Sequence, residues 1–238
     1  MCWDHGFVSK GQVFFRIHAD TILQVISFRY EQVFSHYSLE IGLMSLYSEA
    51  EDSVFGARST LNSYSICCLE NHSSAVYMSA EGEFVSFKVK SPEYQLRLLE
   101  KYGFEWLDGI VTQKDLLQAI NFLETVSYKS TIWNNISKLA PFLAIDDYDS
   151  ADFVIASILN QHLGSNSFSS PPWSKEDFLY YSVHYPNKDV DLLYLHDLIA
   201  TKNENAIKAY LEENYKKNTD RLRFTKRTGD GSGGHNTV

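Results

Sequence analysis

The chain has 238 residues, of which 44% are hydrophobic, 21% charged and 14% aromatic. This composition is ordinary for a globular protein and excludes a globally disordered chain, a collagen-like fibre and a disulfide-rich scaffold. The net charge of −9 excludes a uniformly basic binder of nucleic acid, because phosphate groups are neutralised by Lys and Arg.

The few cysteines and the short apolar segments favour a cytoplasmic location. Three cysteines, Cys2, Cys67 and Cys68, are too few for a disulfide framework. The N-terminus carries Asp4 where a secretory signal needs basic residues. The longest apolar stretch, 139–145, is far shorter than the roughly 18 residues of a membrane span. We therefore expect a cytoplasmic protein with neither a membrane nor a nucleic-acid partner.

The first third of the chain contains short apolar segments, most of which we interpret as helices. Residues 12–18 indicate a strand or a buried lead-in. A helix is predicted after Asp20, interpreted as its N-cap, and a second one after Ser38, because apolar residues recur at helical spacing behind both. A third helix is predicted from about residue 53 to 78, where Gly and Pro are scarce.

Between residues 79 and 90 the spacing of the apolar residues changes to a period of two, which is typical of a strand. Glu81 to Glu83 form a predicted turn, and Val85, Phe87 and Val89 then alternate with polar residues. We expect a minor one- or two-stranded β element near 80–90, packed against helices.

Helix starts are clearer in the remainder of the chain. Ser91 precedes Pro92, and the segments 112–115 and 174–177 resemble capping boxes with Asp in place of Glu. Gly164 to Pro172 form a predicted loop. Further helices are predicted at about 130–143, 150–163, 174–184, 189–200 and 203–217. The predicted fold is mainly α, with antiparallel helical hairpins stacked in one domain over 1–217 and a disordered basic, Gly-rich tail over 218–238.

The charge is unevenly distributed along the chain. From residue 216 onward, six basic and two acidic residues leave +4, so the preceding body carries −13. Within that body, residues 142–197 contain nine acids and only two lysines, which leaves −7 in about a quarter of its length. Carboxylates favour helix N-termini, and such ends can also gather on one face that attracts a basic partner. The candidate partner-binding residues are Asp146, Asp147, Asp149, Asp152, Glu176 and Asp177.

No catalytic motif accompanies this acidic segment. The sequence lacks a nucleophile elbow, a phosphate-binding glycine loop, an EF-hand loop and zinc-type Cys/His spacing, so we predict no cofactor and no metal. A metal or acid–base site around His184, Asp189 and His196 stays open as an enzymatic alternative.

The order of parts resembles a known family. A strand over 82–87 precedes a helix containing Gln118 to Leu123, and the chain closes with Asp197 to Ala200 and Ala206 to Glu213. This order is similar to that of the mostly helical immunity proteins of bacterial polymorphic and type VI secretion toxin systems. The resemblance implies a cytoplasmic, non-enzymatic protein that binds and blocks a cognate toxin, often by covering its active site.

We therefore expect an immunity protein whose acidic face docks a basic toxin domain. A helical scaffold or adaptor that binds a peptide partner is the alternative within the binding proteins, and a homodimer stays open.

Overall fold

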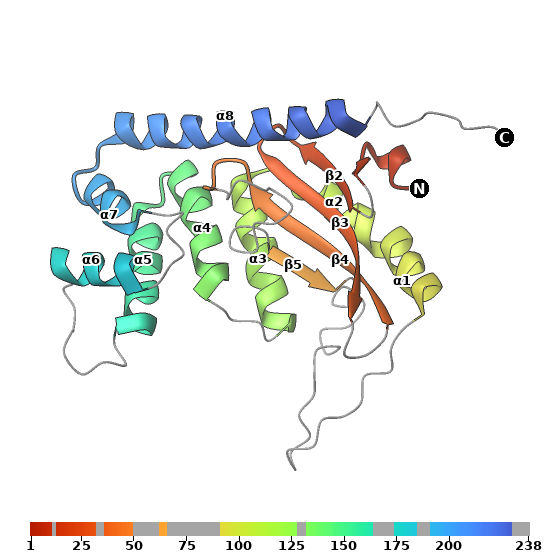
Figure 1. The fold of residues 1–238 in the computed structure, drawn as a ribbon, viewed down its shortest axis with the longest axis horizontal. Coiled ribbons are helices and arrows are strands. Elements are labelled where there is room, and N and C mark those ends of the chain that lie inside the picture. The colour runs from red at the N-terminus through yellow and green to blue at the C-terminus, as the bar shows by residue number, and fades with distance from the viewer. Residues whose placement is uncertain are drawn as a thin grey trace, which may run out of the picture. The chain divides into compact units, whose positions relative to one another are not determined.

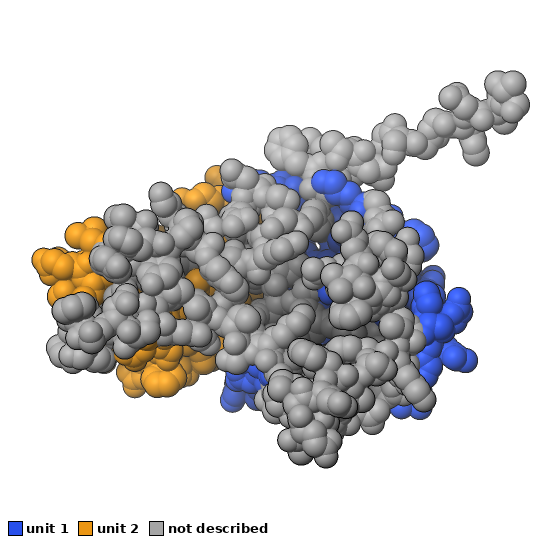
Figure 2. Space-filling model, turned by 60° about the horizontal axis from the view of Figure 1, so that its bottom comes forward, with its two compact units in different colours: residues 1–43, 63–130, 220–238 blue, residues 44–62, 131–219 orange. Residues whose placement is uncertain are grey.

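A computed structural model of the protein describes residues 1–10, 13–31, 36–49, 62–65, 91–127, 132–163, 174–184 and 191–229. The chain divides into two compact units, coloured separately in Figure 2. Unit 1 contains residues 1–43, 63–130 and 220–238, and unit 2 contains residues 44–62 and 131–219. Each unit has a hydrophobic core of its own.

Within the described residues, a sheet of five strands, arranged in chain order, provides the framework of unit 1 (Figure 1). Strand β1 runs antiparallel to β2, and β2 runs antiparallel to β3 with His18 opposite Ile22. The strands are β1 (Val8–Lys10), β2 (Val13–His18), β3 (Ile22–Glu31), β4 (His36–Ser45) and β5 (Asn62–Ser65). The fold expectation of a mainly helical chain with a minor β element is therefore wrong, because the sheet is substantial.

The helix predicted after Asp20 is strand β3, and both faces of that strand are buried. Ile22 and Ile26 belong to the core that faces the helices, whereas Leu23 and Val25 are buried on the opposite face. A strand buried on both faces loses the alternation of apolar and polar residues that identifies strands, and its apolar run fits helical spacing equally well. Asp20 is not an N-cap; with Ala19 it forms the β2–β3 turn at positive φ values of 60° and 46°.

Strand β4 replaces the helix predicted after Ser38. Leu39, Ile41 and Leu43 recur with a period of two and enter the core of unit 1. Strand β5 likewise contradicts the helix predicted over 53–78 within residues 62–65. The remainder of that prediction, the β element near 80–90 and the Cys67–Cys68 pair lie outside the described residues.

Two helices of unit 1, α1 and α3, begin where the sequence predicts. The Ser91 side chain accepts a hydrogen bond from the Tyr94 amide at 3.2 Å and caps α1 (Pro92–Leu98). A π-helical segment, Leu99–Gly103, joins α1 to α2 (Phe104–Asp108). Helix α3 (Gln113–Ser127) starts at the predicted capping box: Thr112 Oγ1 accepts from the Asp115 amide at 3.1 Å, and Asp115 Oδ2 accepts from the Thr112 amide at 2.9 Å. Of the two alternatives for residues 12–18, a strand or a buried lead-in, the structure shows a strand, β2, over residues 13–18.

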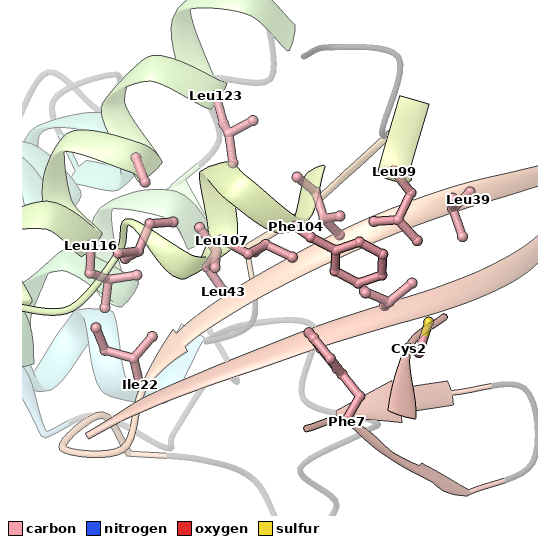
Figure 3. Packing of buried hydrophobic residues seen from close by; sticks show 14 of the residues in the cluster. Cys2, Phe7, Ile22, Leu39, Leu43, Leu99, Phe104, Leu107, Leu116 and Leu123 are labelled. Atoms are coloured by element: carbon pink, nitrogen blue, oxygen red, sulfur yellow. The ribbon is translucent and has the colours of Figure 1, made fainter. Parts of the chain in front are cut away.

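The core of unit 1 lies between one face of the sheet and these helices (Figure 3). Leu116, Ile120 and Leu123 recur at helical spacing along the buried face of α3. Phe104 of α2 packs edge-on against Phe7, with ring centroids 6.2 Å apart. Apolar side chains from strands and helices thus form one continuous core.

Unit 2 is a helical assembly built mainly around α5. Helix α5 packs against α4, α6 and α7, and the first part of α8 contributes Ile207 and Leu211 to the same core. The helices are α4 (Ile132–Ala144), α5 (Tyr148–Leu163), α6 (Lys175–His184), α7 (Leu192–Ala200) and α8 (Glu204–Gly229). These elements confirm the five helices predicted over 130–217.

Helix α8 continues beyond its predicted end at residue 217 and reaches Gly229. Residues 218–229 are therefore helical where the sequence predicts a disordered tail, whereas residues 230–238 and the predicted loop 164–172 lie outside the described residues. Among the helices that the structure describes, none is both long and apolar enough to cross a membrane.

Candidate functional site

All six predicted partner-binding carboxylates belong to unit 2, where they surround the N-terminal ends of α5 and α6. One pair lies in the α4–α5 turn, one on α5 and one in the first turn of α6. Asp152 of α5 and Phe178 of α6 both contact His196 of α7, so the structure brings the first turns of α5 and α6 near each other. The residues are Asp146, Asp147, Asp149, Asp152, Glu176 and Asp177.

Asp146 and Asp147 build the turn between α4 and α5. Asp146 has a positive φ of 58°, and its amide donates to the Leu143 carbonyl at 3.2 Å while the Asp147 amide donates to the Phe142 carbonyl at 3.0 Å. These two bonds form a Schellman motif that ends α4. Asp147 Oδ1 then accepts from the Ser150 amide at 3.1 Å and caps α5. Both acids thus have local structural roles.

Asp177 also has a structural role, as half of a capping box at the start of α6. Its Oδ2 accepts from the Ser174 amide and from Ser174 Oγ, each at 2.8 Å. The Asp177 amide donates in return to Ser174 Oγ at 3.2 Å. This reciprocal pair satisfies donors that the helix end leaves without intrahelical partners.

The remaining three carboxylates face solvent. Asp149 and Glu176 are exposed, and the Asp152 side chain is half exposed. Within the described part of the chain, none of these three forms an ion pair with a Lys or Arg side chain. All three side chains are therefore accessible to solvent.

His196 connects three helices at this region. Its Nδ1 lies 3.0 Å from Asp152 Oδ1, which joins α7 to α5. Its ring stacks on Phe178 of α6, with centroids 5.2 Å apart and planes inclined by 29°. The sequence suggested His196 as part of an enzymatic site with His184 and Asp189; the side chain of His184 and the whole of Asp189 lie outside the described residues.

Two large apolar side chains that are adjacent in sequence to Asp152 and Phe178 are exposed. Phe153, next to Asp152, is 72% exposed, and Leu179, next to Phe178, is 57% exposed. Asp149 precedes Phe153 by four residues and Glu176 precedes Leu179 by three, so each acid shares a helix face with one exposed apolar residue. We call this region the Asp152–His196 surface; it comprises Asp149, Asp152, Phe153, Glu176, Leu179 and His196, with the buried Phe178 beneath His196.

Sequence reasoning missed Phe153 and Leu179. For Phe153, the sequence of α5 contains a sign of exposure: Phe153 falls on the same side of the helix as the polar residues Asp149 and Asn160, away from the apolar stripe. For α6 no comparable signal exists, since its sequence has only a weak separation of apolar and polar sides.

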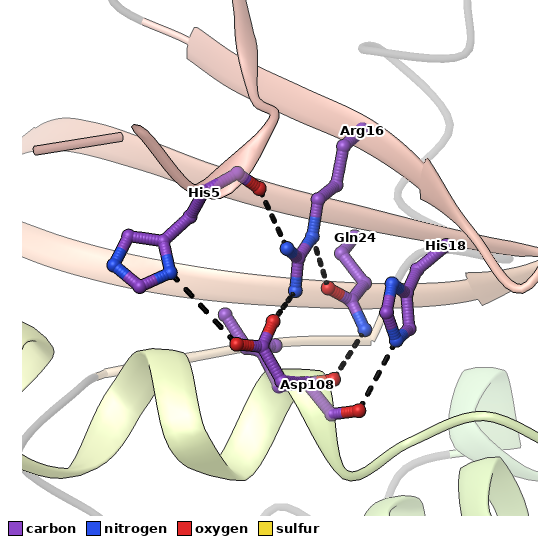
Figure 4. Close-up of polar contacts among 6 residues, drawn as sticks. His5, Arg16, His18, Gln24 and Asp108 are labelled. Carbon is purple, nitrogen blue, oxygen red and sulfur yellow. Dashed lines mark hydrogen bonds and ion pairs between the residues drawn. The ribbon is translucent and has the colours of Figure 1, made fainter. Parts of the chain in front are cut away.

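Unit 1 contains a second polar cluster, centred on Arg16 of β2 (Figure 4). Arg16 Nη1 donates to the His5 carbonyl at 2.6 Å, Nε donates to Gln24 Oε1 at 2.8 Å, and Nη2 donates to the Asp108 carboxylate. Gln24, fully buried on β3, donates from Nε2 to the Leu107 carbonyl at 2.7 Å. The cluster therefore fastens β2 and β3 to the C-terminal end of α2.

Two histidines border this cluster. His18 Nε2 lies 3.1 Å from the Asp108 carbonyl oxygen, and His5 Nδ1 lies 3.8 Å from Asp108 Oδ2. The His5 ring is stacked on Phe104 with centroids 3.8 Å apart. Because the Arg16 donors and the Gln24 amide are used within the fold, we interpret the cluster as structural. Among the described residues, no group of three or more His, Cys, Asp or Glu is placed to hold a metal ion.

Comparisons of this chain with protein-family models, with curated proteins and with solved structures found no match. The Asp152–His196 surface therefore has to be interpreted from its own geometry. It combines the exposed apolar side chains of Phe153 and Leu179 with carboxylates one turn away on the same helix faces.

Proposed function

We propose that the protein is a non-enzymatic immunity protein that binds and neutralises a cognate bacterial toxin through the Asp152–His196 surface. One observation carries the proposal: on two packed helices, an exposed carboxylate lies one turn before an exposed large apolar residue. The pairs are Asp149 with Phe153 and Glu176 with Leu179. In protein interfaces a few well-packed side chains contribute most of the affinity, and charges at the rim accelerate association.

The charge distribution supports a basic partner. The segment 142–197 carries −7, and the three solvent-facing acids of the surface belong to it. A concentrated field of one sign raises the association rate of an oppositely charged protein by about tenfold or more at low salt. Binding by itself neutralises a toxin when it covers the catalytic residues, and this mechanism requires no chemistry from the immunity protein.

The first experiment uses the protein encoded by the reading frame next to the gene of this chain. We expect that protein to inhibit growth when it is expressed alone, to be tolerated when this chain is co-expressed, and to co-elute with it in size-exclusion chromatography. A neighbouring gene product that is harmless alone, or whose toxicity persists despite this chain, contradicts the proposal.

The second experiment tests the surface with variants chosen to preserve the fold. Asp149→Asn, Asp152→Asn and Glu176→Gln together remove three charges, and Asn at 152 keeps an oxygen for His196. We expect the association rate to fall by about tenfold at low salt and its dependence on ionic strength to flatten. Asp146 and Asp147 are left intact, because changing them would disturb the α4–α5 turn.

A matched control removes three exposed acids of unit 1. The variant Asp20→Asn, Glu100→Gln, Glu105→Gln changes the net charge by the same amount, and Asn tolerates the positive φ at position 20. We expect this control to retain most of the wild-type rate. Equal slowing by both triple variants would show that net charge, and not the Asp152–His196 surface, steers the partner.

A further inference from the structure

We infer that Phe153 is the apolar anchor of the Asp152–His196 surface, and that it inserts into a pocket of the partner bordered by Lys or Arg side chains. This inference rests on the proposed function and deepens it, because it names the residue that carries the affinity and the chemistry of the complementary patch.

The position of Phe153 on α5 supports this role. At about 100° per residue, Asp149, Phe153 and Asn160 fall on one side of α5, and that side is exposed. The opposite side packs into the core of unit 2 through Ala151, Val154, Ile155, Ile158 and Leu159. Phe153 therefore contributes little to the core, although an aromatic ring that is 72% exposed keeps a large apolar area in contact with water.

The surroundings of Phe153 indicate what covers it. Asp149 lies on the same face one turn earlier, and Asp152 is adjacent in sequence with its side chain half exposed. A second copy of this chain docking the same face around a two-fold axis would place these carboxylates opposite one another, which is unfavourable. An apolar pocket with a cationic rim complements both the Phe153 ring and the carboxylates, so we infer that the binding partner of this surface is a basic protein.

The test compares Phe153→Ala with Trp3→Ala, both measured against the neighbouring gene product by surface plasmon resonance. Trp3 is an exposed aromatic residue of unit 1 and serves as the matched control. We expect Phe153→Ala to raise Kd roughly 30-fold, mainly through faster dissociation, as for an interface hot spot. We expect Trp3→Ala to leave Kd within about twofold of the wild type, the range expected for a residue outside the interface.

The outcomes separate the anchor from the proposed function. If the wild type relieves toxicity but Phe153→Ala binds as tightly as the wild type, the anchor inference is overturned and the proposed function stands. If the wild type does not bind at all, the proposed function fails first. If sedimentation shows that the wild type is a dimer and Phe153→Ala a monomer, a second copy covers the ring and the basic partner is overturned. The thermal unfolding temperature of Phe153→Ala should equal that of the wild type, because position 153 is exposed.

Discussion

Replacing Arg16 by Lys tests whether the geometry of the guanidinium group, and not its charge, holds β2 and β3 to α2. Arg16 donates through three different nitrogens to the His5 carbonyl, to Gln24 Oε1 and to the Asp108 carboxylate. Lysine keeps the charge but has a single nitrogen at the end of its side chain, so it cannot reach three acceptors that lie in separate directions.

The expected loss of stability follows from the hydrogen bond that each acceptor loses. Gln24 is 0% exposed, so an Oε1 atom without a donor costs about 1–3 kcal/mol of stability. The lost bond to the His5 carbonyl adds about 1 kcal/mol. We therefore expect Arg16→Lys to destabilise unit 1 by about 2–4 kcal/mol. Arg16→Met should cost at most about 1 kcal/mol more, because the Asp108 side chain is 45% exposed and can be solvated by water when the ion pair is lost.

The assay is urea unfolding of the full chain, with amide hydrogen exchange measured on peptides of unit 1 to assign the effect to that unit. Arg97→Lys, at an exposed position of α1, is the control and should change stability by less than about 0.5 kcal/mol. An Arg16→Lys variant as stable as the wild type would refute the geometric reasoning. A large loss confined to Arg16→Met would show that charge pairing with Asp108 dominates.

Two further predictions concern α8 in unit 2. Asn218 Nδ2 donates to the carbonyls of Leu46 and Ser48 at 2.8 Å each, so the buried carboxyl group introduced by Asn218→Asp should have a raised pKa. The substitution should therefore cost more stability at pH 7, about 3 kcal/mol, than at pH 4. Equal losses in urea unfolding at the two pH values would contradict this prediction. Burial, followed by the charge of Glu49, raises the pKa of Tyr210 above its usual value near 10, so the wild type should lose stability as the pH rises past that value. Tyr210→Phe should lose less stability between pH 9 and 11 than the wild type, and parallel losses would disprove the link.

The sequence by itself located most of the helix starts from residue 91 onward. The capping hydroxyl of Ser91 and the boxes at 112–115 and 174–177 lie where predicted, because a cap is a contact between residues two or three positions apart. The excess of acidic residues over 142–197 also located the acidic region of unit 2. Local chemistry determines these features, so no knowledge of distant residues is needed.

Only the tertiary structure decided the sheet and the composition of the surface. Strands β3 and β4 escaped detection because residues on both faces are buried, and burial depends on which distant segments cover each face. The contact between Asp152 and His196 spans 44 positions in the sequence. The six carboxylates divide into turn-forming, helix-capping and solvent-facing groups, and this division likewise depends on packing, because similar side chains acquire different roles from their neighbours in space. The exposure of Phe153 depends on packing in the same way.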